Sequence, residues 1–263
     1  MTDTVTTDIL LSRDEGVATL TLNRPEKMNT VTRIMGEQLY ALLLELNKDR
    51  SCRAIVITGA GGNFCTGGDF SDNESKIENP VEGRVRLLQS AHLIELLVNG
   101  PKPVIAAVDG YAYGMGMSLA LACDYIIATD KTVFNAAFSR LGLAAELGLT
   151  WTLPRRIGVG KTKQLLMLSK KVTGADALAM QMVDELCPSA TLAAVALERA
   201  REFAAAAPLV VAYTKSALAK GHATVESAMA TEHEYQAALY MTHDHVEGVK
   251  AMFKKRKPEF NGN

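Results

Sequence analysis

Two short segments without charged side chains most strongly limit what this chain can fold into. Residues 54–58 and 104–108 are almost wholly apolar, and each is followed within two positions by a glycine. Strands that are apolar on both faces are typical of parallel sheets covered by helices on both sides. An alternating segment at 17–22 and a helical spacing of apolar residues over 30–47 precede the first of them. The order strand, helix, buried strand predicts an α/β fold with parallel strands.

The same pattern continues through the middle of the chain. Residues 81–99 have the spacing of a second amphipathic helix, residues 119–123 predict a further helix, and residues 125–129 predict a strand. The polar and acidic stretch 69–80 predicts a surface loop with high mobility. These elements together indicate a repeated β-β-α arrangement.

The composition supports one large domain with a helical appendage. Of the 263 residues, 48% are hydrophobic and 22% are charged, so a substantial core is expected. Beyond about residue 189 the sequence is helical in pattern, with alanine-rich stretches and no further apolar strand. We therefore predict a core domain over residues 1–190 and a helical region over residues 191–263.

Charge and cysteine spacing argue against several classes of protein. There are 28 lysines and arginines against 29 aspartates and glutamates, a net charge of −1, so no general binding of nucleic acid is expected. The basic stretch 254–257 is interpreted as a solvated helix end. The four cysteines have no metal-ligand or disulfide spacing, and His243 and His245 fit a polar helix face, so no metal site is predicted. The first residues do not form a leader and no membrane-length apolar run occurs, so we expect a cytoplasmic protein without membrane contact.

Two glycine-rich turns are candidates for binding a negatively charged oxygen. Residues 64–69 (FCTGGD) and 113–118 (YGMGMS) each follow an apolar segment at a point where a helix can begin. The first amides of a helix have no internal partner, and two converging amides can form an oxyanion hole. Each turn taken alone is more typical of a tight strand-to-helix connection than of a binding site. The second turn lacks the latter half of the G-x-G-x-x-G dinucleotide motif.

Five segments, taken together, resemble the enoyl-CoA hydratase/isomerase family, also called crotonases. They are residues 23–29 (NRPEKMN), 64–69, 103–111 (PVIAAVDGY), 119–124 (LALACD) and 255–260 (KRKPEF). The resemblance covers nearly the whole chain in family order. It implies a spiral of β-β-α repeats with a C-terminal helical trimerisation region, a homotrimer or a dimer of trimers, and an acyl-CoA thioester as substrate.

The resemblance also implies residue roles. The two oxyanion amides correspond to Gly68 and Met115, and the two hydratase glutamates correspond to Ser118 and Phe138. Serine is not a carboxylate base near neutral pH and phenylalanine carries no exchangeable proton. The sequence therefore argues against ordinary enoyl-CoA hydration.

Residues 138–151 are similar to the corresponding segment of Δ3,Δ2-enoyl-CoA isomerases, in which one glutamate is both acid and base; that glutamate corresponds to Glu146. Independently, Glu146 is the sole acidic residue between Asp130 and Asp176 and lies in an apolar run. Desolvation raises a carboxyl pKa toward the range needed for reversible proton transfer. The residues alone also permit a solvated loop glutamate or an ion pair with a nearby arginine.

The predicted activity is the conversion of a 3-enoyl-CoA into a trans-2-enoyl-CoA, which needs no metal or redox cofactor. The resemblance and the local chemistry assign contacts with CoA and the acyl group to Arg24, Lys27, Thr66, Phe70, Tyr113, Phe138, Trp151, Phe253 and Arg256.

The sequence is also compatible with other activities. Within the family they are isomerisation of a ring-derived acyl-CoA, dienoyl-CoA isomerisation, hydrolysis of a carbon-carbon bond, and enoyl-CoA hydration. Outside catalysis, the alternative is a weakly catalytic CoA-binding or RNA-binding protein of this fold.

Overall fold

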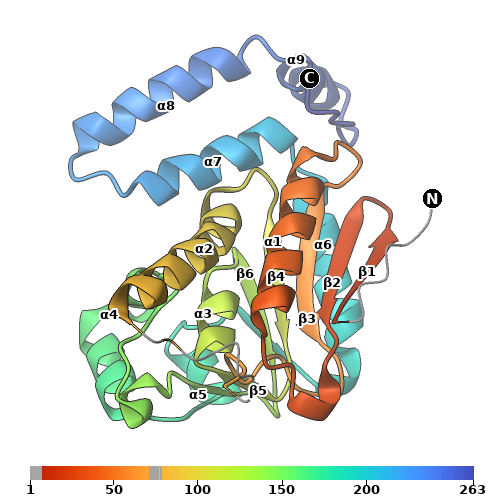
Figure 1. Ribbon diagram of the computed structural model, residues 1–263. Helices are drawn as coiled ribbons and strands as arrows, with labels where there is room; N and C mark the ends of the chain where they lie inside the picture. The colour runs from red at the N-terminus through yellow and green to blue at the C-terminus, as the bar shows by residue number, and fades with distance from the viewer. Residues whose placement is uncertain (1–7, 71–76, 78) are drawn as a thin grey trace.

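The computed structural model describes residues 8–70, 77 and 79–263, and a six-stranded sheet forms the middle of the molecule (Figure 1). The strand order is β1-β2-β3-β4-β6-β9, and every neighbouring pair except β1 and β2 is parallel. The strands are β1 (Ile9–Asp14), β2 (Val17–Leu22), β3 (Ala54–Gly59), β4 (Val104–Val108), β6 (Tyr125–Thr129) and β9 (Glu185–Cys187).

Helices cover both faces of this sheet, which explains why its inner strands are apolar throughout. Side chains alternate along β3. Ile57 belongs to the larger core with α1 (Arg33–Lys48) and α2 (Pro80–Asn99), whereas Val56 belongs to a second cluster with α6 (Leu192–Ala204). The apolar spacing of α1 places four of its residues in the larger core.

A second sheet of three short strands lies near the lower end of the large sheet in Figure 1. Its strands are β5 (Tyr111–Tyr113), β7 (Val133–Asn135) and β8 (Val172–Thr173). The chain passes from β4 into β5 and then into α3 (Met115–Leu121), which is one β-β-α repeat. An isolated parallel bridge between Cys65 and Ala112 places the segment after β3 beside β5.

The remaining helices complete the chain. They are α4 (Leu149–Leu168), α5 (Gly174–Ala179), α7 (Pro208–Lys220), α8 (Val225–Leu239) and α9 (His243–Phe253), with the short 3-10 turns η1 (Pro25–Lys27), η3 (Phe138–Leu141) and η4 (Ser189–Thr191). Gly158 has φ 75° and ψ 162°, which kinks α4.

In Figure 1 helices α7, α8 and α9 extend beyond the end of the large sheet, opposite β5. A buried lysine joins this region to the core. Lys215 Nζ donates to the main-chain oxygens of Leu97 at 3.0 Å and Lys102 at 2.7 Å, and forms an ion pair with Asp124 at 2.6 Å. Because α6 packs on the sheet, the layered part of the fold extends past residue 190 to Ala204.

The structure confirms the predicted α/β class and its main elements. The predicted strands at 54–58, 104–108 and 125–129 and the predicted helices at 30–47 and 81–99 are present within a few residues. The predicted loop at 69–80 lies largely outside the described residues. Within the described part of the chain, no helix has the length and apolar character needed to cross a bilayer.

Candidate active site

The first glycine-rich turn is held between two neighbouring segments. Cys65 N–H donates to Tyr111 O at 2.9 Å, and Tyr113 N–H donates to Cys65 O at 2.9 Å. On the other side, Val31 N–H donates to Gly67 O at 2.9 Å, and Asp69 N–H donates to Val31 O at 3.0 Å. In an extended segment successive residues direct their polar groups to opposite sides. The N–H of the intervening residue, Gly68, therefore points away from Val31.

The second turn begins α3. Gly114 has φ 51°, a left-handed conformation that favours glycine, and its N–H donates to Asn135 O at 2.9 Å. Met115 is the first residue of α3, so its amide has no acceptor one turn earlier. Among the described residues, neither the Met115 nor the Gly68 N–H donates a hydrogen bond.

Close backbone packing brings the two turns together. A Cβ on Gly116 would lie 2.1 Å from Cys65 O, which no real side chain can do. A Cβ on Gly67, which has φ 111°, would lie 3.9 Å from Met115 N. The glycines thus permit a contact that places the two predicted oxyanion residues in adjacent turns, with amides free to bind an oxygen.

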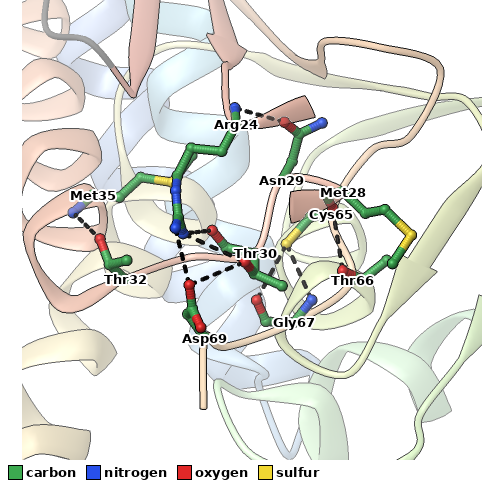
Figure 2. A network of polar contacts seen from close by, with 10 residues as sticks. All are labelled: Arg24, Met28, Asn29, Thr30, Thr32, Met35, Cys65, Thr66, Gly67 and Asp69. Atoms are coloured by element: carbon green, nitrogen blue, oxygen red, sulfur yellow. Dashed lines mark hydrogen bonds and ion pairs between the residues drawn. The ribbon is translucent and has the colours of Figure 1, made fainter. Parts of the chain in front are cut away.

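An ion pair fixes the end of the first turn (Figure 2). Arg24 Nη2 lies 3.0 Å from Asp69 Oδ2, and Arg24 Nη1 donates to Thr30 O at 2.7 Å. Both partners are mostly buried, with 16% and 8% of the side chains exposed. The guanidinium predicted to contact CoA is thus engaged within the protein, next to Gly68.

A buried asparagine extends this network, and sequence reasoning did not single it out. Asn29 is fully buried; its Oδ1 accepts from Arg24 N–H at 2.9 Å, and its Nδ2 donates to Ala60 O at 2.8 Å and Asn63 O at 2.7 Å. Its φ of 57° is left-handed, which asparagine tolerates better than most residues. Asn29 therefore joins the residue 24–30 loop to the loop that follows β3.

Cys65 lies beside Gly67 in Figure 2, with Gly67 N–H 3.4 Å from its sulfur. The thiol is fully buried, and this burial raises the pKa of Cys65 to about 12. The thiol is therefore neutral near pH 7, which makes it a packing group and not a nucleophile.

Glu146 precedes a tight turn at the start of α4. Leu147 and Gly148 have φ of 54° and 71°, and the left-handed conformation of Leu147 is costly for a leucine. A cavity of about 430 Å³ lies between this turn and α2. It is lined by Leu87, Ala91, Ile94, Glu95, Ala145, Glu146, Leu147 and Gly148. Glu146 is half-buried in this mainly apolar wall.

The α2 residues of this cavity were not among the predicted site residues. Leu87, Ala91 and Ile94 recur at spacings of four and three, so one face of α2 contributes them. Glu95 is the second carboxylate of the cavity and is exposed. The helical spacing was visible in the sequence, but it does not tell which face of α2 meets the Glu146 turn.

Ser118 and Phe138 lie beside the second turn. Ser118 is fully buried, and its hydroxyl donates to the main-chain oxygen of Glu146 at 3.1 Å. Phe138 is 6% exposed, and a Cβ on Gly114 would lie 3.9 Å from its ring. At the two positions that the family resemblance assigns to the hydratase glutamates, this chain therefore has a hydroxyl bonded to the main chain and a hydrocarbon ring.

The other predicted contacts near the turns have separate surroundings. The rings of Tyr113 and Tyr111 lie 5.1 Å apart, and Thr66 Oγ1 donates to Met28 O at 3.2 Å. Phe70 is 71% exposed, directly after Asp69. Lys27 is exposed in η1, one turn from Arg24.

Trp151 lies in the first turn of α4 but outside the cavity lining. The Arg155 guanidinium carbon is 3.6 Å from the centre of its ring, a cation–π contact.

Two predicted CoA contacts lie far from these turns within one chain. Phe253 ends α9 and is 79% exposed, and Arg256 follows it. Arg256 pairs with Glu247 at 2.5 and 2.8 Å, and this pairing lowers the pKa of Glu247 to about 2. In Figure 1 α9 and β5 lie at opposite ends of the molecule. One chain therefore does not bring these residues to the Glu146 turn.

Two amide-presenting turns lie in contact with each other, and Ser118 links the second turn to Glu146, the carboxylate of the apolar cavity. Such an arrangement is typical of enzymes that act on a carbonyl group through an enolate. The sequence pattern of the enoyl-CoA hydratase/isomerase family matches residues 12–263, and the chain belongs to this family. It is thus an enzyme of the crotonase fold, of the hydratase or isomerase type, that acts on acyl-CoA thioesters. Across the described residues, no group of three or more His, Cys, Asp or Glu is placed to hold a metal ion.

Known relatives include both types of enzyme. The chain is 35% identical to the 1,2-epoxyphenylacetyl-CoA isomerase of Escherichia coli, over 97% of this chain and 98% of that protein. It is 31% identical to the short-chain-enoyl-CoA hydratase of Clostridium acetobutylicum, over 96% and 97%. The crystal structure of an enoyl-CoA hydratase from Bacillus anthracis superposes with a TM-score of 0.92 at 28% identity, covering 97% of this chain and 100% of that one.

Proposed function

We propose that the protein is a Δ3 to Δ2 enoyl-CoA isomerase in which Glu146 is the single acid and base. The observation that carries this proposal is the position of Glu146 in the apolar cavity between α2 and α4. Ser118 and Phe138, which the family resemblance places at the positions of the two hydratase glutamates, supply no carboxylate. Moving a proton within the substrate needs one base, whereas adding water needs a group that holds and activates the water.

In the proposed reaction the thioester oxygen accepts hydrogen bonds from the Gly68 and Met115 amides. These bonds strengthen as the oxygen gains charge, so they favour loss of a proton from C2. The Glu146 carboxylate takes that proton and becomes a carboxylic acid. The electrons of the broken C–H bond delocalise onto the thioester oxygen as the dienolate forms. The same acid then returns the proton to C4, where the electrons of the C3–C4 double bond take it up and a C2–C3 double bond forms. The product is the conjugated trans-2-enoyl-CoA, with the enzyme unchanged and no atom gained or lost.

The surroundings of the cavity suit this proton transfer. Phe138 packs against the Gly114 turn, and the α2 side chains Leu87, Ala91 and Ile94 are apolar, so water is poorly held there. With few polar groups on this wall, the carboxyl group can pass the proton to the substrate carbon directly. No metal or redox cofactor enters this reaction.

The contacts with CoA remain proposals as well. Thr66 belongs to the Gly68 turn and donates to Met28 O, and the exposed Lys27, in η1, lies next to Met28. We propose that Phe253 and Arg256 approach the CoA of a neighbouring subunit, because one chain keeps them far from its own turns. Positive charge suits the phosphates of CoA.

A second candidate is the isomerisation of a ring-derived acyl-CoA. The observation that favours it is the 35% identity to an enzyme named 1,2-epoxyphenylacetyl-CoA isomerase. In this second proposal the same two oxyanion amides bind the thioester oxygen and Glu146 is again the carboxylate that moves a proton. The two candidates differ in the shape of the acyl group.

The first experiment compares two substrates by the absorbance of the conjugated enoyl thioester. Purified protein is mixed with trans-3-hexenoyl-CoA and, separately, with crotonyl-CoA. We expect a rise in absorbance with the first and no fall with the second. Glu146→Gln should lower kcat for the first substrate by about 10²–10⁴-fold, the usual contribution of a positioned acid or base.

Glu95→Gln is the matched control, because Glu95 lines the same cavity and the change removes the same charge. It should keep kcat within about threefold, since an exposed side chain is not the proposed base. A fall in absorbance with crotonyl-CoA, or an equal loss in both variants, would contradict the single-base proposal. Activity with 1,2-epoxyphenylacetyl-CoA but not with trans-3-hexenoyl-CoA would favour the second candidate.

A further inference from the structure

We infer that Ser118 is a positioning residue that holds the Met115 oxyanion amide and the Glu146 base in one fixed arrangement. The inference rests on the function proposed above. It assigns a role to the buried hydroxyl that replaces a hydratase glutamate.

The first part of the argument is the peptide group between Gly114 and Met115. The carbonyl of Gly114 and the N–H of Met115 belong to the same planar unit, so the direction of one fixes the direction of the other. Ser118 holds this carbonyl twice, through its N–H at 3.1 Å and through its hydroxyl at 3.4 Å. Ser118 thereby orients the amide proposed to bind the thioester oxygen.

The second part is the bond to the base. The Ser118 hydroxyl lies 3.1 Å from the main-chain oxygen of Glu146, 28 residues further along the chain. That oxygen also accepts the N–H of Leu149 at 3.2 Å, so the Glu146 backbone is held from α3 and from α4. A single hydroxyl proton is thus shared between the oxyanion turn and the base turn.

The third part is the need for such a tie. Glu146 is followed by two left-handed residues, Leu147 and Gly148, so its turn is not held by regular helix hydrogen bonds. Proton transfer from C2 and to C4 requires the carboxylate to be placed against a substrate fixed by the oxyanion amides. Ser118 is fully buried, so water does not compete for its hydroxyl.

The test uses three variants and trans-3-hexenoyl-CoA. Ser118→Ala removes the hydroxyl and should lower kcat about tenfold while KM changes less than about twofold, as expected for lost positioning. Ser118→Thr keeps the hydroxyl and should recover most of that loss. Thr162→Val is the matched control, because Thr162 is buried in α4 and its hydroxyl also donates to the carbonyl four residues earlier, at 2.8 Å.

Hydrogen exchange gives a readout that does not depend on turnover. Ser118→Ala, but not Thr162→Val, should speed amide exchange in peptides covering residues 141–150. A wild-type kcat in Ser118→Ala would overturn the inference, whether or not amide exchange becomes faster. A loss of kcat/KM that comes wholly from a higher KM would also overturn it. If the wild type isomerises the substrate and Glu146→Gln does not, a wild-type kcat in Ser118→Ala overturns this inference and leaves the proposed function standing. If the wild type is inactive on every 3-enoyl-CoA, the proposed function falls and the inference falls with it.

Discussion

At the scale of single residues, two glycines of the oxyanion turns differ in how much space surrounds them. A Cβ on Gly116 would lie 2.1 Å from Cys65 O, a backbone atom, whereas a Cβ on Gly68 meets nothing within 4 Å. Gly116→Ala must therefore push the two turns apart. We expect a loss of ~3 kcal/mol in unfolding free energy and about a 10²-fold loss in kcat, because the amides no longer converge.

Gly68→Ala is the matched comparison, because it leaves the amide in place and its side chain has room. It should change the unfolding free energy by less than ~1 kcal/mol. Urea unfolding and the 3-enoyl-CoA assay measure both effects. Equal activity losses in the two variants would show that the turns do not act through their backbone contact.

The two turns could be predicted from the sequence, because in each of them glycines follow an apolar segment at a point where a helix can begin. The structure places Gly68 and Met115 in adjacent turns, and their role as oxyanion donors stays a prediction. The role of Asn29 was beyond sequence reasoning, because its partners Ala60 and Asn63 are more than thirty residues away and are main-chain oxygens. Every residue has a main-chain oxygen, so no pattern of side chains in the sequence predicts the hydrogen bonds of Asn29.

At the scale of elements, long and strongly periodic segments were predictable and short ones were not. The strand β4 has the predicted bounds, and α1 follows the predicted apolar spacing. The strands β7 and β8 have three and two residues, too few to show a period. The helix α4 was not predicted, because Pro154 and Gly158 interrupt its pattern. This mattered for the site, since α4 begins directly after the Glu146 turn.

The C-terminal tail is held to α9 by interactions that depend on pH. Arg256 pairs with Glu247, and Glu247 also accepts the N–H of Glu259 at 3.0 Å. These contacts lower the pKa of Glu247 from 4.5 to about 2, the hydrogen bond from Arg256 being the largest cause. A carboxyl group whose pKa is lower in the folded state stabilises it above its unfolded pKa and loses that contribution as the pH falls.

Glu247→Gln should therefore destabilise the protein at pH 7, and the difference from the wild type should shrink as the pH falls from about 5 to about 2. Urea unfolding of both proteins across this range measures the difference. Glu234→Gln, on the exposed face of α8, serves as the control. A difference that stays constant with pH would mean that the ion pair does not contribute to folding stability.

At the scale of the whole molecule, the C-terminal region is tied to the core by a few specific contacts. Lys215 of α7 reaches main-chain oxygens at the end of α2 and in the loop before β4, and pairs with Asp124. Burial raises the pKa of Asp124, while the Lys215 charge opposes that rise. These contacts hold α7, the first helix of the C-terminal region, against the core. Apolar side chains of α8 and α9 are exposed.

Exposed apolar side chains of α9 and of the turn before it indicate that another chain covers this region. Met241, in the turn between α8 and α9, is 87% exposed, and Met252 in α9 is 66% exposed, which is costly unless another chain covers them. The family resemblance implies the number of subunits, and from it we predict a homotrimer or a dimer of trimers. For chains of 28.3 kDa, three give about 85 kDa and six give about 170 kDa by sedimentation.

Met252→Glu should shift the mass toward 28.3 kDa, because a buried unpaired charge opposes association. Met167→Glu on α4 is the matched control, since Met167 has a nearly equal exposed fraction of 67%. It should leave at least the trimer intact.

If Met167→Glu separates the subunits and Met252→Glu does not, the contact lies at α4, and the proposal that Phe253 and Arg256 approach the CoA of a neighbouring subunit loses its basis. If Met252→Glu alone yields monomers and also raises KM for the acyl-CoA, the neighbouring tail completes the binding site.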